Sequence, residues 1–438
     1  MTPDQRTKQP GLPAFARAGL LALLALGSAN TAQAQSAYGC SALEAHTSLP
    51  AVEGRDGMFF AIRPELQAHQ AINDETITLL AQLGTNLAKR GTTLVLLPVP
   101  TRAQVFDRAL TTKARDVGYD AADATAVHLD MLVRLRASGL TVADARPALR
   151  SAATAGEQPY FQTDMRPTPV GTRILAAAVG KALAKHPGHT KRPTANFISA
   201  AGAVVTLDSS MRARLQTACQ SQLPAVTAQS FTTTRSSGVA TNNPENRLVV
   251  LGADTTQTEA LNLKGFLAEA TGYETLAYGV KGGGAFAAMS SYLTSADFQA
   301  NAPRVLVWEF PVSATFAAQG DQPLKELIAA TGNNCQKTLP VTVGPTGQSL
   351  SADLSQMTTR GDVTLSVETG GAAPSYLRFH FTSRDGLIRT RSIYRHPDQL
   401  LTGRFFLPLS GLNATGLQSV EIEAPAAFGA QSRIAVCS

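Results

Sequence analysis

A short loop after a predicted buried strand carries the first residues that could do chemistry. Residues 248–251 (LVVL) form a continuous apolar run, and Gly252-Ala253-Asp254-Thr255-Thr256 follows it. In an open parallel sheet, functional groups lie at the carboxyl ends of the strands. Small residues at such a turn can present a nucleophile or bind an anion, but this loop contains no serine or cysteine. Its only ionisable residue is Asp254.

A second polar segment contains Asp164 and Arg166 and leads through Thr168-Pro169 into a stretch rich in Ala, Leu and Val. Threonine suits the cap position of a helix and proline suits its first helical position. The pattern therefore predicts that both charged residues lie just before a helix.

A run of three glycines, Gly282-Gly283-Gly284, is the third candidate. Consecutive glycines can aim backbone N–H groups at an oxyanion. The alternative is a turn that needs glycine only for its backbone geometry.

Arginines and aromatic residues alternate near the C-terminus. The arginines are Arg378, Arg384, Arg389, Arg391, Arg395 and Arg404, and Tyr376, Phe379, Phe381 and Tyr394 lie among them. Guanidinium groups suit the carboxylates of a uronate polymer, and aromatic faces suit sugar rings. The alternative is an ordinary solvated sheet face. The single tryptophan, Trp308, lies in a predicted core strand and is assigned to packing.

The elements around these residues predict two modules. From about residue 50 to 330, apolar β-branched runs at 92–97, 248–251 and 304–310 alternate with helical patterns such as 121–137 and 170–185. Such alternation predicts a parallel α/β sheet with helices on both faces. Residues 193–246 look like a polar loop excursion. From residue 339 onward, short alternating segments predict an antiparallel β-sandwich.

Composition excludes several classes of protein. The chain has 438 residues, of which 44% are hydrophobic and 16% are charged, so a disordered protein is excluded. A net charge of +6 is too small and too dispersed to indicate a nucleic-acid partner.

The first 34 residues have the pattern of a signal peptide. A basic lead precedes the apolar run 18–28, and Ala32-Gln33-Ala34 offers a cleavage site. The apolar run is too short to span a bilayer, and no other run approaches that length. We expect export to the periplasm and no membrane span in the mature chain; a buried N-terminal helix is the alternative.

The cysteines fit an oxidising compartment. Cys40, Cys219, Cys335 and Cys437 include no C-x-x-C pair, so the sequence predicts no metal site, and no cofactor is indicated. Four cysteines in an exported protein predict two disulfides, with three possible pairings.

The chain resembles the periplasmic alginate O-acetyltransferases of the alginate biosynthesis and secretion complex. The resemblance rests on Lys281–Gly284, Tyr292–Ser295, Asp297-Phe298, 304–310, Pro100–Arg102, 420–425 and the final Cys437, and it covers nearly the whole mature chain. It implies an SGNH-hydrolase-like domain at 40–335 and a carbohydrate-binding β-sandwich at 336–438. It also implies the disulfides Cys40–Cys219 and Cys335–Cys437.

The family's catalytic residues do not carry over. Members use a serine where this chain has Asp254, and an Asp-x-His-Trp motif where it has Asp164-Met165-Arg166-Pro167. A family tyrosine falls near Ala260. Arginine cannot act as the base that a serine nucleophile needs, because its pKa lies above 12. We expect Arg166 to form an ion pair with Asp254 in place of the lost chemistry.

Two functions remain open from the sequence. The first is a non-catalytic protein that binds an acidic exopolysaccharide such as alginate, in company with other periplasmic acetylation and secretion proteins. The second is an active polysaccharide O-acetyltransferase with a rebuilt site. The residues favour binding, and the resemblance favours polysaccharide acetylation as the process.

Overall fold

The computed structural model describes residues 36–67, 72–186, 195–238, 246–314, 316, 320–332, 335, 337–357, 363–409, 411–412 and 416–437. The predicted signal peptide lies outside these ranges. Within them, no helix is both long and apolar enough to cross a bilayer. Contacts group Ser36–Ser438 into one compact unit, so the domain boundary at 335/336 stays a prediction. We call the described residues before and after this boundary the α/β module and the β-module.

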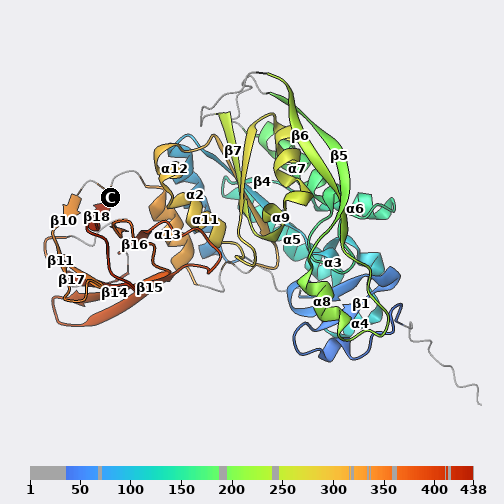
Figure 1. Ribbon diagram of the computed structural model, residues 1–438, viewed down its shortest axis with the longest axis horizontal. Helices are drawn as coiled ribbons and strands as arrows, with labels where there is room; N and C mark the ends of the chain where they lie inside the picture. Colours follow the sequence, from blue (N-terminus) through green and yellow to red (C-terminus); the bar gives the residue numbers. More distant parts are fainter. Residues whose placement is uncertain are drawn as a thin grey trace, which may run out of the picture. The chain divides into compact units, whose positions relative to one another are not determined.

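Five parallel strands form the central sheet of the α/β module (Figure 1). Their order is β4-β3-β9-β7-β8. The strands are β3 (Thr93–Val99), β4 (Thr141–Val142), β7 (Arg247–Gly252), β8 (Glu274–Gly279) and β9 (Val305–Pro311). The three central strands are buried along nearly their whole length because helices cover both faces. The predicted α/β class is confirmed.

Helices pack against each face of this sheet. One face carries α2 (Asp74–Lys89), α5 (Ala121–Ala137), α11 (Ala287–Leu293) and α13 (Gln322–Ala330), and the other carries α6 (Arg146–Thr154), α7 (Pro169–Ala184) and α10 (Leu263–Thr271). The predicted cap is present, since the Thr168 hydroxyl accepts the N–H of Gly171 at the start of α7.

Shorter elements complete the α/β module. They are β1 (Ala51–Glu53), β2 (Phe59–Ala61), α1 (Ile62–Glu65), α3 (Arg102–Val105), α4 (Thr112–Asp116), α8 (Ser210–Gln216), α9 (Asp254–Gln257) and α12 (Ala296–Ala300).

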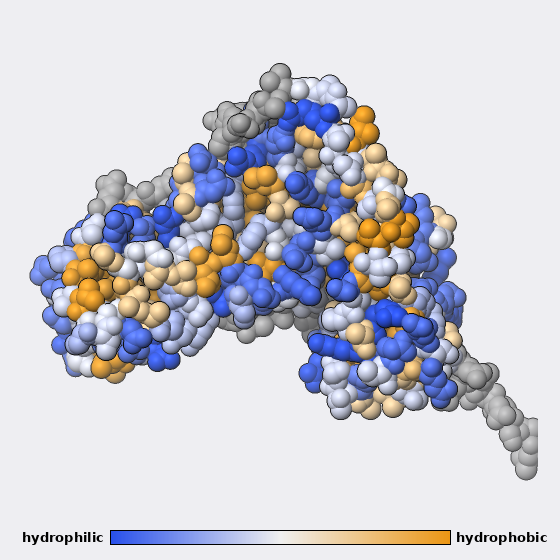
Figure 2. Space-filling view, in the orientation of Figure 1, coloured by the Kyte–Doolittle hydropathy of each residue, from blue (hydrophilic) through white to orange (hydrophobic). Residues whose placement is uncertain are grey.

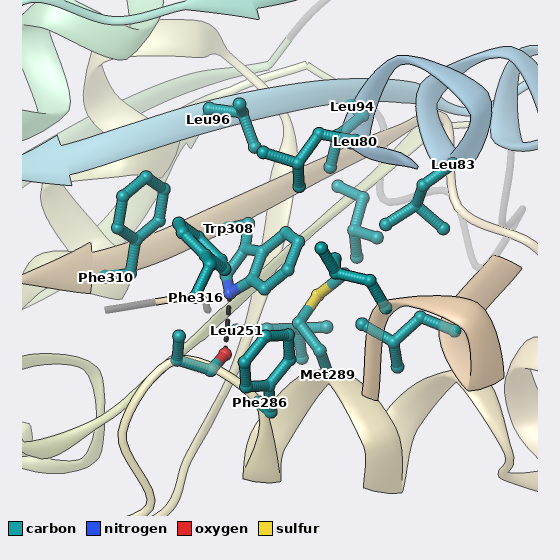
Figure 3. Close-up of a cluster of buried hydrophobic side chains, with 14 of the residues drawn as sticks. Leu80, Leu83, Leu94, Leu96, Leu251, Phe286, Met289, Trp308, Phe310 and Phe316 are labelled. Carbon is teal, nitrogen blue, oxygen red and sulfur yellow. Dashed lines mark hydrogen bonds between the residues drawn. The ribbon is translucent and has the colours of Figure 1, made fainter. Parts of the chain in front are cut away.

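Trp308 lies at the centre of the first hydrophobic cluster, as Figure 3 shows. Its side chain is fully buried and packs edge-on against Phe286 and Phe316. The indole N–H donates to the carbonyl oxygen of Ala285 at 2.8 Å. The assignment of Trp308 to packing is confirmed, and its hydrogen bond fixes the segment that follows the glycine run.

The structure corrects the expected loop at 193–246. Two long antiparallel strands, β5 (Asn196–Thr206) and β6 (Thr227–Ser237), pair with each other as a two-stranded ribbon. The segment of chain that joins them contains α8. The ribbon is largely exposed, so its strands lack the buried apolar stripe that identifies a strand in sequence. Its β-branched threonines were the signal available.

The β-module consists of two antiparallel sheets, as predicted. Their strand orders are β10-β18-β13-β16 and β11-β12-β17-β14-β15. The strands are β10 (Lys337–Leu339), β11 (Val341–Val343), β12 (Ser349–Asp353), β13 (Thr364–Glu368), β14 (Tyr376–Ser383), β15 (Ile388–Tyr394), β16 (Arg404–Pro408), β17 (Leu417–Glu423) and β18 (Arg433–Cys437). Alternate side chains, such as Phe379 and Phe381 of β14, fill the core between the sheets.

Two disulfides, Cys40–Cys219 and Cys335–Cys437, use all four cysteines. This pairing confirms the one that the family resemblance implies. Disulfides of this kind are typical of proteins in oxidising compartments.

A buried ion pair joins the two modules. Arg395, which follows β15, donates from Nη1 to Oε2 of Glu326 on α13 at 2.7 Å, and from Nη2 to Oε1 at 2.6 Å. The two side chains are only 3% and 5% exposed. The guanidinium carbon lies 4.4 Å from the ring centroid of Phe405, and the N–H of Phe406 donates to Glu326 as well. This bidentate contact therefore fixes the start of the β15–β16 connection against the α/β module.

We predict that Glu326→Ala lowers the free energy of unfolding by about 3–5 kcal/mol, because it leaves the Arg395 charge buried without its partner. Glu368→Ala is the control, since Glu368 pairs with Arg404 and Arg433 on a more exposed surface and should cost about 1 kcal/mol or less. Denaturant unfolding measures both. Equal losses in the two variants would contradict the prediction.

Candidate functional site

The glycine run and Asp254 meet at the carboxyl edge of the parallel sheet. β7 ends at Gly252, and Asp254 is the first residue of α9. Oδ2 of Asp254 accepts the backbone N–H of Gly282 at 3.1 Å. Gly282 and Gly284 have φ of +65° and +58°, so the turn also needs glycine for its geometry. The amide that was expected to face an oxyanion faces a carboxylate of the protein.

Arg166 pairs with Asp164, two residues away, and not with Asp254. Its Nε donates to Oδ1 and its Nη2 to Oδ2, each at 2.8 Å, and the Arg166 backbone N–H also reaches Oδ1. The expected Arg166–Asp254 ion pair was therefore wrong. Burial opposes ionisation of both groups, yet their mutual contact holds the pKa of Asp164 below its usual value and raises that of Arg166.

A hydrogen-bond chain still links the two predicted segments. Nη1 of Arg166 donates to the Thr258 hydroxyl at 3.1 Å, and that hydroxyl donates to the backbone carbonyl of Asp254 at 2.6 Å. The Asp254 charge also favours the charged form of Arg166. The structure thus brings Asp164, Arg166, Asp254 and Gly282 into one site.

Arg102 positions the segment that carries Asp164. Its side chain is fully buried, forms an ion pair with Glu65, and donates from Nη1 to the carbonyl oxygens of Phe161 and Gln162 at 3.2 and 3.0 Å. Backbone carbonyls that point at a buried cation have little freedom to move. The chain therefore enters the Asp164 turn in a fixed direction.

Glu309 is a site residue that the sequence analysis missed. It lies on β9 and is 2% exposed, and its Oε2 accepts the Ala253 N–H at 3.2 Å and the Thr256 hydroxyl at 2.9 Å. A Cβ on Gly252 would lie 2.1 Å from the same oxygen, which explains the glycine there. Burial raises the pKa of Glu309 to about 7, against the lowering effect of these hydrogen bonds. The available signal was an acid inside an otherwise apolar strand.

His396 is the second missed residue, and it comes from the β-module. The connection between β15 and β16 lies against the α/β module through hydrogen bonds from Leu400 N–H to the Tyr278 hydroxyl and from Gln399 to Ser291. The imidazole Nε2 lies 3.9 Å from where a Cβ on Gly282 would be. No local sequence pattern marks this histidine, because only the packing of the two modules brings it to the glycine run.

The predicted arginine cluster is not one surface, and two of its members form close ion pairs with carboxylates of the protein, one of them buried. Arg395 is buried on Glu326, so its assignment to polysaccharide was wrong. Arg404 pairs with Glu368 at 3.1 Å.

The remaining four arginines are divided by the strand register. Arg389 and Arg391 pair with Phe381 and Phe379, so they share the inward face of the sheet at its edge. Arg378 pairs with Ser392 and lies on the opposite, outer face. Arg384 lies in the hairpin and donates to the Ser355 carbonyl. The strand arginines are close in sequence, but the register of β14 and β15 places them on different faces of the sheet.

Within the described ranges, no group of three or more His, Cys, Asp or Glu side chains is arranged to hold a metal ion. On the face drawn in Figure 2, hydrophobic residues form separate groups with polar residues between them.

The fold and the position of the site define an SGNH-hydrolase-like protein with an appended antiparallel β-module. The chain belongs to the family described as "SGNH hydrolase-like domain, acetyltransferase AlgX", whose match covers residues 51–312.

Named relatives agree with this assignment. The chain is 28% identical over 264 residues to the alginate biosynthesis protein AlgX of Pseudomonas aeruginosa, covering 59% of this chain and 55% of that protein. It is 24% identical over 285 residues to the probable alginate O-acetylase AlgJ of the same organism, covering 61% of this chain and 71% of that protein. The matched region thus spans about half the length of the AlgX relative.

A solved structure of P. aeruginosa AlgX has the same fold, with a TM-score of 0.75 at 22% identity. It covers 89% of this chain and 94% of that one. The similarity therefore extends through the β-module, and the predicted architecture is confirmed.

We predict that Glu309→Gln changes how stability depends on pH. The pKa of Glu309 is about 7 in the folded chain against an ordinary value of 4.5, so the folded state holds the extra proton between these values. The stabilisation of the folded state by this proton is therefore complete below pH 4.5. It is lost as the pH rises through 7, and the free energy of unfolding falls by about 3 kcal/mol in all. Glu309→Gln should remove this loss, measured by denaturant unfolding from pH 4 to 8.

His128 must be controlled in that experiment, because it acts in the opposite direction. Burial lowers the pKa of this 3%-exposed imidazole from 6.5 to about 4, so its effect destabilises the fold as pH falls through that window. The comparison of Glu309→Gln with its parent should therefore be made in a His128→Leu background. If the free energy of unfolding of the two proteins changed with pH in parallel, Glu309 would not be the source of the pH dependence.

Proposed function

We propose that this protein is a non-catalytic, exported member of the alginate acetylation machinery that binds an acidic, alginate-like exopolysaccharide. The observation that carries the proposal is the contact between the Asp254 carboxylate and the Gly282 N–H. By the family resemblance, Asp254 stands at the position of the serine nucleophile. The Gly282 N–H, which could otherwise donate to the oxyanion formed during acyl transfer, donates to the Asp254 carboxylate instead.

The chemistry of the site supports the same proposal. A serine nucleophile needs a neutral base within hydrogen-bonding distance, and Arg166 at the histidine position remains protonated. Its bidentate contact with Asp164 stabilises that charge further. An acyl group transferred to Asp254 would form a labile mixed anhydride instead of a stable ester.

One contact favours the alternative, a rebuilt O-acetyltransferase. The Thr256 hydroxyl donates to Glu309, and a carboxylate with a pKa near 7 is suited to general-base catalysis. Thr256 is only 7% exposed, however, and the same Glu309 oxygen also accepts the Ala253 N–H. The pair is therefore arranged to hold the loop, and the non-catalytic function ranks first.

The outer face of β14 and β15 is the surface we propose for the polymer. Tyr376 and Tyr394 are directly paired there, with ring centroids 5.6 Å apart, and Tyr394 is 66% exposed. Arg378 and His380 continue the same face along β14, where both contact Glu423 of β17, at 3.7 and 3.2 Å; the Arg378 side chain is still 43% exposed. Exposed tyrosine rings suit sugar rings, and the arginine suits uronate carboxylates.

We predict no turnover of acetyl esters. Incubation of the mature protein with 4-nitrophenyl acetate should give no product burst, and intact-mass spectrometry should show no acetyl adduct. Thr256→Val is the matched comparison, because it removes the hydroxyl that donates to Glu309 and should change nothing. A burst in the parent that is absent from Thr256→Val, or an acetyl group on Thr255 or Thr256, would establish the alternative function.

We predict binding of oligouronates that strengthens with chain length and weakens as salt rises, because each charged contact is weak and screened. The double variant Arg378→Ala/Tyr394→Ala should bind about tenfold more weakly, each contact being worth on the order of 1 kcal/mol or less. Arg433→Ala, which removes one charge from the other sheet, should bind like the parent. Isothermal titration calorimetry at low salt measures all three, and a parent that does not bind contradicts the proposal.

A further inference from the structure

His396 reaches the candidate site on a connection that is held at several points. Arg395 next to it is fixed by Glu326, and the Leu400 N–H donates to Tyr278 at 2.7 Å. The Ser291 hydroxyl donates to the Leu400 carbonyl at 2.9 Å, and Thr402 contacts Thr294 at 2.8 Å. A side chain on such a connection loses little additional freedom when it binds a ligand.

The ring orientation of His396 is set by its own turn. The backbone N–H of Asp398 donates to Nδ1 of His396 at 3.2 Å, so Nδ1 is an acceptor. In a neutral imidazole the other nitrogen then carries the proton. Nε2, the nitrogen nearer the glycine run, is therefore a hydrogen-bond donor. In this tautomer Nε2 cannot accept a proton from a nucleophile, so the imidazole is not placed to act as a base there.

Asp254 supplies acceptor capacity at the same place. A carboxylate can accept about four hydrogen bonds, and the Gly282 N–H takes one of them through Oδ2. Asp254 is only partly buried, so part of this residue remains accessible to a ligand.

We propose that His396 and Asp254, one from each module, bind a sugar hydroxyl group of the polysaccharide at the glycine run. A hydroxyl is both donor and acceptor, so it can donate to the Asp254 carboxylate while it accepts the Nε2–H of His396. A uronate carboxylate is disfavoured at this point, because Asp254 carries the same charge and Arg166 is already neutralised by Asp164. This inference rests on the proposed polysaccharide-binding function and names the chemical group that the altered site recognises.

The test uses the full mature protein with a uronate hexasaccharide and its per-O-methylated counterpart, which keeps the carboxylates but has no hydroxyl donors. His396→Phe should bind the free hexasaccharide about five- to tenfold more weakly, because a neutral donor is lost. His396→Gln, which keeps an N–H donor, should stay within about twofold of the parent. His46→Phe, a histidine that contacts Thr217 away from this site, is the matched control.

NMR provides a second readout on the parent protein, for which a variant is needed only to assign the signal. The His396 imidazole signal, assigned by its absence from His396→Gln, should shift on addition of the free hexasaccharide and remain in place with the methylated one. If the parent binds the hexasaccharide, the Arg378→Ala/Tyr394→Ala variant is weakened, and yet His396→Phe binds normally without a shift of the imidazole, this inference alone fails. A parent that binds no hexasaccharide overturns both this inference and the proposed function.

Discussion

The candidate site depends on two neighbouring residues at the carboxyl end of β9. Glu309 is a buried carboxyl group, and its cost of burial is only partly offset by the Ala253 N–H and the Thr256 hydroxyl. Trp308, whose side chain points to the opposite face of the sheet, donates its indole N–H to Ala285. One strand end therefore fixes both the Asp254 loop and the segment after the glycine run. Without these contacts, the Asp254 loop and the segment after the glycine run would not be fixed relative to each other.

Charge in this site is satisfied locally, which explains why the expected ion pair did not form. Asp164 lies two residues from Arg166, so a bidentate contact forms within one turn. A guanidinium whose planar edge already faces one carboxylate has less to gain from a second one further away. Asp254 instead accepts a backbone N–H. These local contacts thus hold the Asp164 turn and the Asp254 loop in place.

The sequence allowed prediction of the elements whose side-chain pattern matches their burial. Strands β3, β7 and β9 and helices α5 and α7 have continuous or periodic apolar residues, and the structure has them close to the expected bounds. The β5–β6 ribbon was missed because it is largely exposed and packs against α10 through only a few side chains such as Phe231, so its strands carry no such pattern. Arg378 lies on the opposite face of the sheet from Arg389 and Arg391, because register and period-two alternation decide the face of a strand residue, whereas proximity in sequence does not.

His396 shows where sequence reasoning must stop in a protein of this kind. Its place beside Gly282 is set by the packing of two modules, and that packing rests on Glu326 and Arg395, which are an ordinary acid and an ordinary arginine in sequence. The β-module therefore contributes more than a separate surface. It places the His396 imidazole beside a glycine run whose Gly282 N–H is held by Asp254 of the α/β module, and this juxtaposition is the basis for the sugar hydroxyl that we propose there.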